Sequence, residues 1–268
     1  MLLVWGLLLS WLGPGCPAFA AEPVRVPPLA PIERGEYRAR DARTEEELWR
    51  TRWNLEARTQ GGGTTVHVEE EGRGRVEEVG PAVWSVRIDA VFAGADRRLS
   101  SRREIRNDAG RLVKVEEREL NYTTGSGQVT ITDAGAGRAE VRQVSLTVAS
   151  ISAEMLAAHL RLLPARDGRQ ARFELITRDG KAVPVVASVV GTERVTVPAG
   201  TFECYKIEVD PTGFIGFLSD IFLPRIFMWH TVAPPHYWVK YQGPDEGRLS
   251  REIIRELVRF ETHPGGTP

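Results

Sequence analysis

The chain contains little cysteine and little lysine. Cys16 and Cys204 are its two cysteines, and lysine stands only at positions 114, 181, 206 and 240, so most of the 35 basic residues are arginine. Because Cys16 lies in a segment that we expect to be removed, the mature chain keeps Cys204 alone and forms no internal disulfide. A chain of this length buries about 70–75% of its unfolded surface, so we expect a packed core to supply the stability.

The sequence also lacks the short motifs of catalysis and metal binding. It has no G-x-S-x-G elbow, no H-E-x-x-H or C-x-x-C motif, and no glycine-rich loop followed by Lys-Ser or Lys-Thr. We therefore assign no catalytic residue, no metal ligand and no cofactor. We predict that the protein is not an enzyme.

Long stretches of one charge are absent as well. The net charge is −1, and acidic and basic residues alternate closely, as in Glu116-Glu117-Arg118-Glu119. Nucleic-acid binding needs a clustered basic surface, so we do not expect nucleic acid as a partner.

The first twenty residues have the pattern of a secretory signal peptide. Residues 2–12 are almost wholly apolar, and Ala18-Phe19-Ala20 offers small residues for cleavage, although no basic residue precedes the apolar run. That run is shorter than the about 20 residues that span a bilayer. Cys16 does not fit a lipoprotein signal, because Gly13 stands where a leucine-like residue is preferred. We expect cleavage after Ala20 and a periplasmic or secreted protein.

The remaining chain divides into three parts by composition. Prolines at 23, 27, 28 and 31 predict a proline-rich tether over residues 21–44. Residues 45–260 read as a single β-rich domain, and residues 261–268 as a flexible tail.

Apolar and polar residues alternate through most of this domain. One such run places six apolar residues on one face of a strand, namely Ala82, Trp84, Val86, Ile88, Ala90 and Phe92. About ten such runs are separated by short turns, which predicts an antiparallel meander. We expect a mainly β (α+β) fold in which the meander forms a curved sheet or incomplete barrel.

One helix is expected to cover that sheet. It starts at Ser152, carries Leu156, Leu160 and Leu163 along one side, and ends before Pro164. His159 lies beside that stripe, and we expect it at the helix surface or boundary. The last segment, residues 248–260, fits a helix or a strand, and we favour a strand.

A β-hairpin carries the clearest family resemblance. Two strand-like runs, Glu193–Val197 and Phe202–Val209, flank the turn Pro198-Ala199-Gly200. This V-x-V-P-A-G-T-F hairpin resembles the signature of a domain-of-unknown-function family of secreted bacterial proteins. That family is similar to the LolA- and LolB-like carriers, which handle lipoproteins in the periplasm. The resemblance implies an open β-barrel whose apolar interior holds an acyl chain, and it carries over no catalytic residue.

Residues 213–229 are unusually dense in aromatic and aliphatic side chains. Gly216 and Pro224 interrupt the run, which suits a loop or short helix at the mouth of a cavity. Such a segment can bind an acyl chain, contact a membrane peripherally, or plug the barrel as core. The candidate ligand-binding residues are Phe214, Phe217, Ile221, Phe222, Trp229 and Trp238.

Three functions follow, in order of preference. The first is a non-enzymatic periplasmic or envelope protein that binds a lipid or other amphiphile in an apolar concavity. The second is a structural or protein-interaction module whose partner is another envelope protein. The third is a metal-dependent hydrolase built on Asp220, His230 and His236, whose spacing matches no known zinc motif. We expect Cys204 to be a buried, inert thiol.

Overall fold

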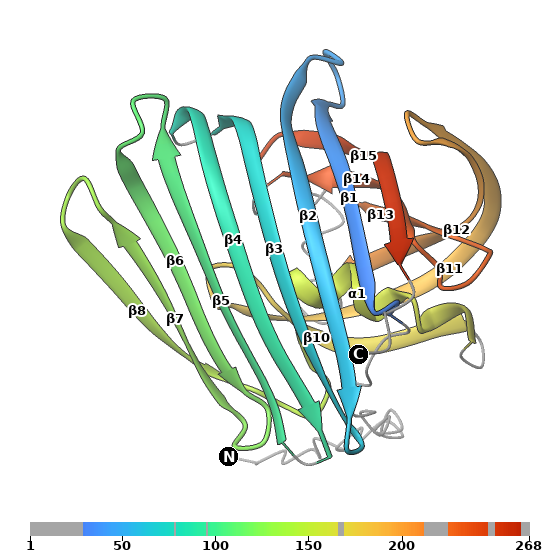
Figure 1. Ribbon diagram of the computed structural model, residues 1–268, viewed down its shortest axis with the longest axis horizontal. Coiled ribbons are helices and arrows are strands. Elements are labelled where there is room, and N and C mark those ends of the chain that lie inside the picture. Colours follow the sequence, from blue (N-terminus) through green and yellow to red (C-terminus); the bar gives the residue numbers. More distant parts are fainter. Residues whose placement is uncertain are drawn as a thin grey trace, which may run out of the picture.

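The computed structural model describes residues 29–77, 79–94, 96–165, 169–211, 225–245 and 250–263. These residues form one fifteen-stranded sheet with a short helix against it (Figure 1). The strand order is β8-β7-β6-β5-β4-β3-β2-β1-β15-β14-β13-β12-β11-β10-β9, so β8 and β9 are the two edges and the sheet is not closed. The predicted mainly β fold with an incomplete barrel is confirmed.

The strands are β1 (Ile32–Asp41), β2 (Glu47–Gln60), β3 (Gly63–Val76), β4 (Gly80–Ala93), β5 (Asp96–Asn107), β6 (Leu112–Asn121), β7 (Ser126–Asp133), β8 (Arg138–Ser145), β9 (Ser150–Ser152), β10 (Gln170–Ile176), β11 (Ala182–Val197), β12 (Gly200–Pro211), β13 (Ile226–Thr231), β14 (Trp238–Pro244) and β15 (Glu252–His263). The helix α1 spans Leu156–Leu160, between the 3₁₀ turns η1 (Ala153–Met155) and η2 (Leu163–Ala165). Neighbouring strands pair antiparallel, except that β9 and β10 are parallel. None of the helical segments among the described residues has the length and apolar character needed to cross a membrane.

Strand β1 lies inside the segment that was predicted to be a tether. That prediction is wrong for residues 32–41, which pair with β2 on one side and with β15 on the other. Tyr37 and Ala39 are buried, whereas Arg38 and Arg40, which alternate with them, are partly exposed, as a strand with one covered face requires. The prediction of a strand near the carboxyl end is confirmed, but β15 runs to His263 and so includes the first residues of the predicted tail.

The predicted hairpin is present as β11 and β12. Val197 pairs with Gly200, whose φ of +132° suits a residue without a side chain. The hairpin arches back over the sheet (Figure 1), and the backbone N–H of Ala199 donates to the carbonyl of Leu257 in β15. Its valines Val195 and Val197 join a second apolar cluster with Trp229 and Leu257.

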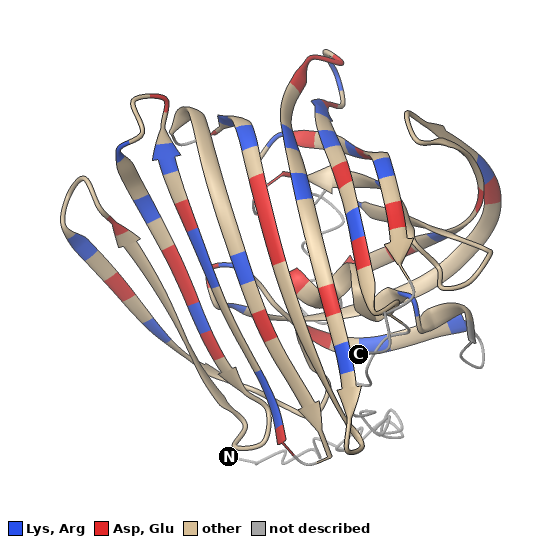
Figure 2. Ribbon diagram, in the orientation of Figure 1, with Lys and Arg blue, Asp and Glu red and all other residues tan. Residues whose placement is uncertain are grey.

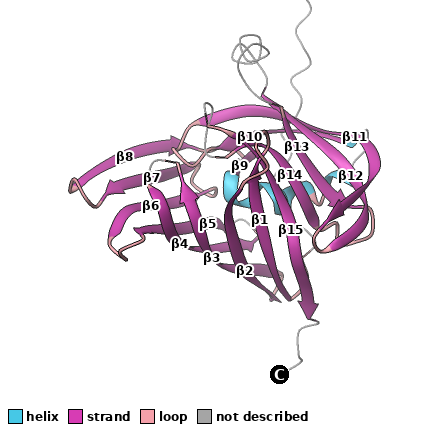
Figure 3. Ribbon diagram, turned by 90° about the horizontal axis from the view of Figure 1, so that it is seen from above, coloured by secondary structure: helices cyan, strands magenta, loops and turns pink. Residues whose placement is uncertain are grey.

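The helical segment lies within the curve of the sheet (Figure 3). Leu156, Leu160 and Leu163 are buried in the main apolar cluster, together with residues of β2 to β13. We call the sheet face that they cover the inner face. His159 is also buried, with its ring edge-on to Phe173, so its predicted surface position is wrong.

Two buried ion pairs tie this segment to distant strands. Near its start, Arg118 of β6 reaches Glu154 at 2.8 Å. Past its end, Arg161 makes two hydrogen bonds of 2.7 and 2.8 Å to Glu33 of β1. The Arg161 side chain is 7% exposed and that of Glu33 is 0% exposed, so neither charge has water as a substitute partner.

The Glu33–Arg161 pair is therefore expected to be a strong constraint. Arg161→Leu should lower the free energy of unfolding by about 3–5 kcal/mol, because it leaves a buried carboxylate without its cation. The double variant Glu33→Leu/Arg161→Leu should recover much of that loss. Arg34→Leu, a control on the exposed face of β1, should change stability by less than about 0.5 kcal/mol. Urea unfolding measures all three, and a loss below about 1 kcal/mol in the single variant would contradict the assignment.

Candidate functional site

Charged residues occupy several inward positions of the sheet. Because alternate residues of a strand share a face, Glu70 of β3 lies on the same face as Val66. The same rule places Arg103, Glu116 and Arg118 on the face that carries Leu99 and Leu120. We call the connected set Arg255, Glu70, Arg103, Glu116, Arg118 and Glu154 the inner polar belt.

Short contacts run along this belt from β15 to the helical segment. Glu70 accepts hydrogen bonds from Arg255 and from the indole of Trp84, both at 3.4 Å. The Arg103 guanidinium lies 5.8 Å from the Trp84 ring centroid and 3.5 Å from the carboxylate of Glu116. The belt thus holds both charge signs in a largely buried place.

Basic residues surround the carboxylate of Glu116. Burial raises its pKa, but Arg103, Arg178, Lys114 and Arg118 outweigh that effect, and the pKa lies below its usual value. Glu116 is therefore ionised at neutral pH.

At the β15 end of the belt, Arg255 lies within a cage of aromatic rings. Its guanidinium carbon is 4.6 Å from the ring centroids of both Tyr37 and Trp238, and 5.1 Å from that of Trp49. Such distances are those of cation–π contacts. The Arg255 side chain is 16% exposed and makes one long hydrogen bond of 3.3 Å to Thr51 besides that to Glu70. A guanidinium has five N–H donors, so Arg255 can also donate hydrogen bonds to an anionic ligand.

Further rings extend the cage along the inner face. The Tyr37 ring lies 6.2 Å from that of Trp53, which lies 5.9 Å from Phe260, which in turn lies 3.8 Å from Tyr237. Trp53, Phe260 and Tyr237 are only partly buried. The arrangement places apolar surface beside a cation, and this combination suits a ligand with an apolar part and an anionic group.

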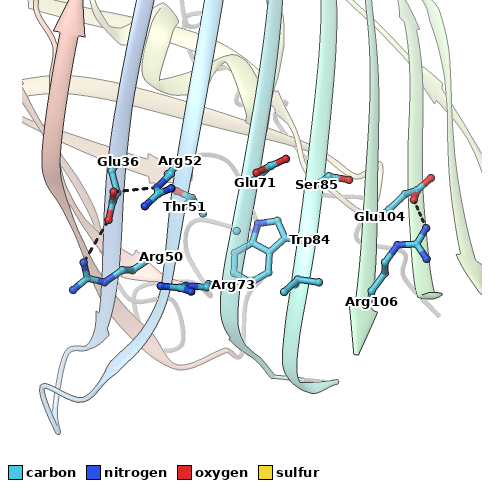
Figure 4. Close-up of a pocket in the computed structure, with 12 residues that line it drawn as sticks. Glu36, Arg50, Thr51, Arg52, Glu71, Arg73, Trp84, Ser85, Glu104 and Arg106 are labelled. Carbon is cyan, nitrogen blue, oxygen red and sulfur yellow. Dashed lines mark hydrogen bonds and ion pairs between the residues drawn. The ribbon is translucent and has the colours of Figure 1, made fainter. Parts of the chain in front are cut away.

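The opposite, outer face carries a groove of about 440 Å³ across β1 to β5 (Figure 4). Basic and acidic positions alternate along the strands of this sheet (Figure 2). Glu36 pairs with both Arg50 and Arg52 at 3.4 Å, and Arg106 pairs with Glu104 at 3.0 Å. Charged side chains make up most of the groove lining, with Val83 and Ser85 among them.

The structure separates the predicted ligand-binding residues. Trp238 is part of the aromatic cage. Trp229 is 3% exposed, donates from its indole to Glu193 at 2.5 Å, and lies in the second apolar cluster, against which Trp238 also packs. The lysines Lys206 and Lys240 lie 5.4 and 4.7 Å from the Trp229 ring centroid. Outside the described residues lie Phe214, Phe217, Ile221, Phe222 and Asp220.

Arg255, Tyr37 and Trp53 were missed as site residues. An arginine at an inward position breaks the apolar alternation of residues 253–257, and that break left the segment ambiguous between helix and strand. Tyr37 lay in the supposed tether.

The two histidines of the metal hypothesis bond to the backbone. His230 donates from Nδ1 to the carbonyl of His236 at 3.0 Å, and His236 donates from Nδ1 to the carbonyl of Thr231 at 2.9 Å. Within the described residues, no three His, Cys, Asp or Glu side chains are grouped so that they could hold a metal ion. Burial lowers the pKa of His230 to about 3.

The fold defines a β-barrel-like protein whose sheet does not close. Residues 50–240 match the family described as "Protein of unknown function (DUF3108)", and since this is more than half of the chain, the protein belongs to that family. No curated protein is detectably similar to the chain in sequence.

The chain is similar to solved structures at low sequence identity, and the first of those described next shares its fold. A β-barrel-like protein of the domain of unknown function DUF1849 from Brucella abortus is 13% identical, with a TM-score of 0.54 over 89% of this chain and 100% of that chain. A protein from Parabacteroides distasonis is 10% identical over 90% and 99% of the two chains, with a TM-score of 0.39. A protein with a YmcC-like fold from Bacteroides fragilis is 12% identical over 90% and 100%, with a TM-score of 0.38.

We predict that His230 stays neutral well below neutral pH. Burial lowers its pKa and outweighs the hydrogen bond to the His236 carbonyl, which raises it, while the charges of Arg161 and His236 add to the lowering. The unfolded histidine binds its proton near pH 6.5, so the contribution of His230 to stability is complete above that pH. It is lost as the pH falls toward 3, by at most about 1.4 kcal/mol per pH unit.

Proton NMR of the histidine rings between pH 7.5 and 4.5 checks this prediction. The His230 signals should not shift, whereas His67, whose pKa is raised by its hydrogen bond to Asp89, should titrate above the ordinary value. A His230 midpoint near 6.5 would contradict the buried, neutral ring.

We also predict that the thiol of Cys204 is unreactive in the folded protein. Burial raises its pKa to about 12, with Glu203 and Glu193 acting in the same direction, so almost no thiolate is present at pH 8. Iodoacetamide should label the unfolded protein at least tenfold faster than the folded protein, as measured by intact mass. Equal rates would show that the thiol is accessible.

Proposed function

We propose that the protein is a non-enzymatic, extracytoplasmic binding protein for an amphiphile with an anionic head group. The observation that carries the proposal is the position of Arg255, inside the sheet and among the rings of Tyr37, Trp49 and Trp238. The head group would bind the guanidinium, and the apolar part would lie along the rings. The signal-peptide pattern of residues 1–20 supports the location.

The chemistry of the cage supports a charged rather than a neutral ligand. Glu70 and Thr51 bond to Arg255 at 3.4 and 3.3 Å, which is longer than the usual range for charge-assisted bonds. An incoming carboxylate or phosphate would replace these weak contacts with shorter ones. Burial of each CH₂ group of the apolar part contributes about 0.8 kcal/mol, so ten carbons supply about 8 kcal/mol before ordering costs.

A fluorescent fatty acid tests this proposal. The full chain is titrated with dansyl-undecanoic acid and with its uncharged methyl ester. Arg255→Met should weaken binding of the acid about tenfold or more, because a charge-assisted hydrogen bond is lost, and should leave ester binding unchanged. Trp238→Ala should weaken both, because it removes apolar contact area.

Two variants serve as controls. Arg259→Met lies on the same strand with an exposed side chain, and it should bind both probes as the unmodified protein does. Arg255→Lys keeps the charge and should retain part of the acid preference. If the unmodified protein binds neither probe, or if Arg255→Met binds the acid normally, the proposal fails.

A second candidate, a protein-interaction module of the cell envelope, is favoured by a different observation. The helical segment and its leucines fill much of the inner face with the protein's own side chains. Native mass spectrometry with organic extraction, on protein exported to a bacterial periplasm, separates the two candidates. A bound lipid or acylated species supports the amphiphile carrier, and a clean apo mass supports the interaction module.

A further inference from the structure

The strand register lines up the charges of the outer face in two rows across the sheet. Direct cross-strand partners form the arginine row, which consists of Arg38, Arg50, Arg73, Val83 and Arg106 on β1 to β5. Two residues further along each strand, direct partners form the acidic row, which consists of Glu36, Arg52, Glu71, Ser85 and Glu104. Figure 4 shows Arg50, Arg73 and Arg106 in one line and the acidic row in another, with the groove between them.

The arginine row is unfavourable for the sheet itself. Arg50 lies directly opposite Arg38 on one side and Arg73 on the other, and like charges in such pairs destabilise a sheet. Ion pairs with Glu36 and Glu47 offset the repulsion at Arg50. For Arg73, the carboxylate of Glu47 interacts at longer range, but no carboxylate of a described residue lies within ion-pair distance, and its side chain is exposed. A costly arrangement of this kind is expected where a ligand supplies the missing charge.

We propose that this groove binds an extended acidic polysaccharide, a chain whose sugar units carry carboxylate groups. The carboxylates bond to the arginine row, whose cations repeat at the strand spacing of about 4.8 Å, with one strand skipped at Val83. The sugar hydroxyls donate hydrogen bonds to Glu36, Glu71 and Glu104 of the acidic row. Val83, one of the most exposed large apolar residues, offers an apolar contact to the sugar ring.

The acidic row decides between this ligand and other anions. It repels a densely charged polyphosphate, which has no hydrogen-bond donors to offer to three carboxylates. A groove with a wall on each side also fits a chain better than a flat bilayer. The site lies on the face opposite Arg255, so it does not depend on the amphiphile proposal.

Titration calorimetry with the hexamer of galacturonic acid tests the site on the full chain. The unmodified protein should bind the acidic hexamer and should not bind maltohexaose, a neutral hexamer. Arg73→Ala should weaken binding about tenfold and reduce the slope of log affinity against log salt concentration by about one. Arg194→Ala, an exposed arginine on the β11–β12 hairpin outside the groove, is the matched control and should bind normally.

Several results would overturn the assignment. Equal binding by Arg73→Ala, equal affinity for the neutral hexamer, or no binding of the acidic hexamer would each do so. Binding of phosphatidylglycerol vesicles in its place, with the same loss in Arg73→Ala, would assign the groove to a membrane surface. Because both substitutions are at exposed positions, their effect on unfolding should stay within about 0.5 kcal/mol, and urea unfolding checks this.

Discussion

The structure depends on the two buried ion pairs that hold the helical segment inside the open sheet. A sheet with free edges at β8 and β9 has no closure of its own, so its apolar inner face needs a cover. Leu156, Leu160 and Leu163 provide it, but leucine packing alone does not fix position. The ion pairs Glu154–Arg118 and Arg161–Glu33 fix the position of the segment. Separating a buried charge from its partner costs several kcal/mol of folding free energy. The two pairs join β6 to β1, five strands apart.

The helical segment covers only part of the inner face, and the rest of that face carries charged and aromatic residues. The inner polar belt and the aromatic cage lie on the same face of the sheet as the leucine-filled core, and all of the cage rings except that of Tyr37 are only partly buried. The outer face of the same strands carries the charged groove. Two different surfaces share one set of strands, because neighbouring residues point to opposite faces: Thr51 contacts Arg255 inside, while Arg50 and Arg52 line the groove outside.

Much of the fold was predictable from local patterns, and much of the site was not. The alternation of residues 82–92, the leucine stripe of the helix and the hairpin turn at Gly200 are local signals, and each is confirmed. Strand β1 was missed because its partner β15 lies more than 200 residues away and its short alternation follows a run of prolines. Arg255 was missed because a charged residue at an inward position looks like a break in a strand. Its partners, Glu70 and the surrounding aromatic rings, come from other strands and are brought to it only by the fold.

By itself, the sequence determined the class of fold, the turns and the place of the helical segment, since all of these depend on residue type and short-range periodicity. Only the tertiary structure decided which charged side chains lie next to one another. In the chain, Arg50, Arg73 and Arg106 are separated by acids and look like an ordinary mixed surface; in the sheet, antiparallel register sets them in one row. Register is a property of strand pairs, so no single strand contains the information that assembles the row, the groove or the cage.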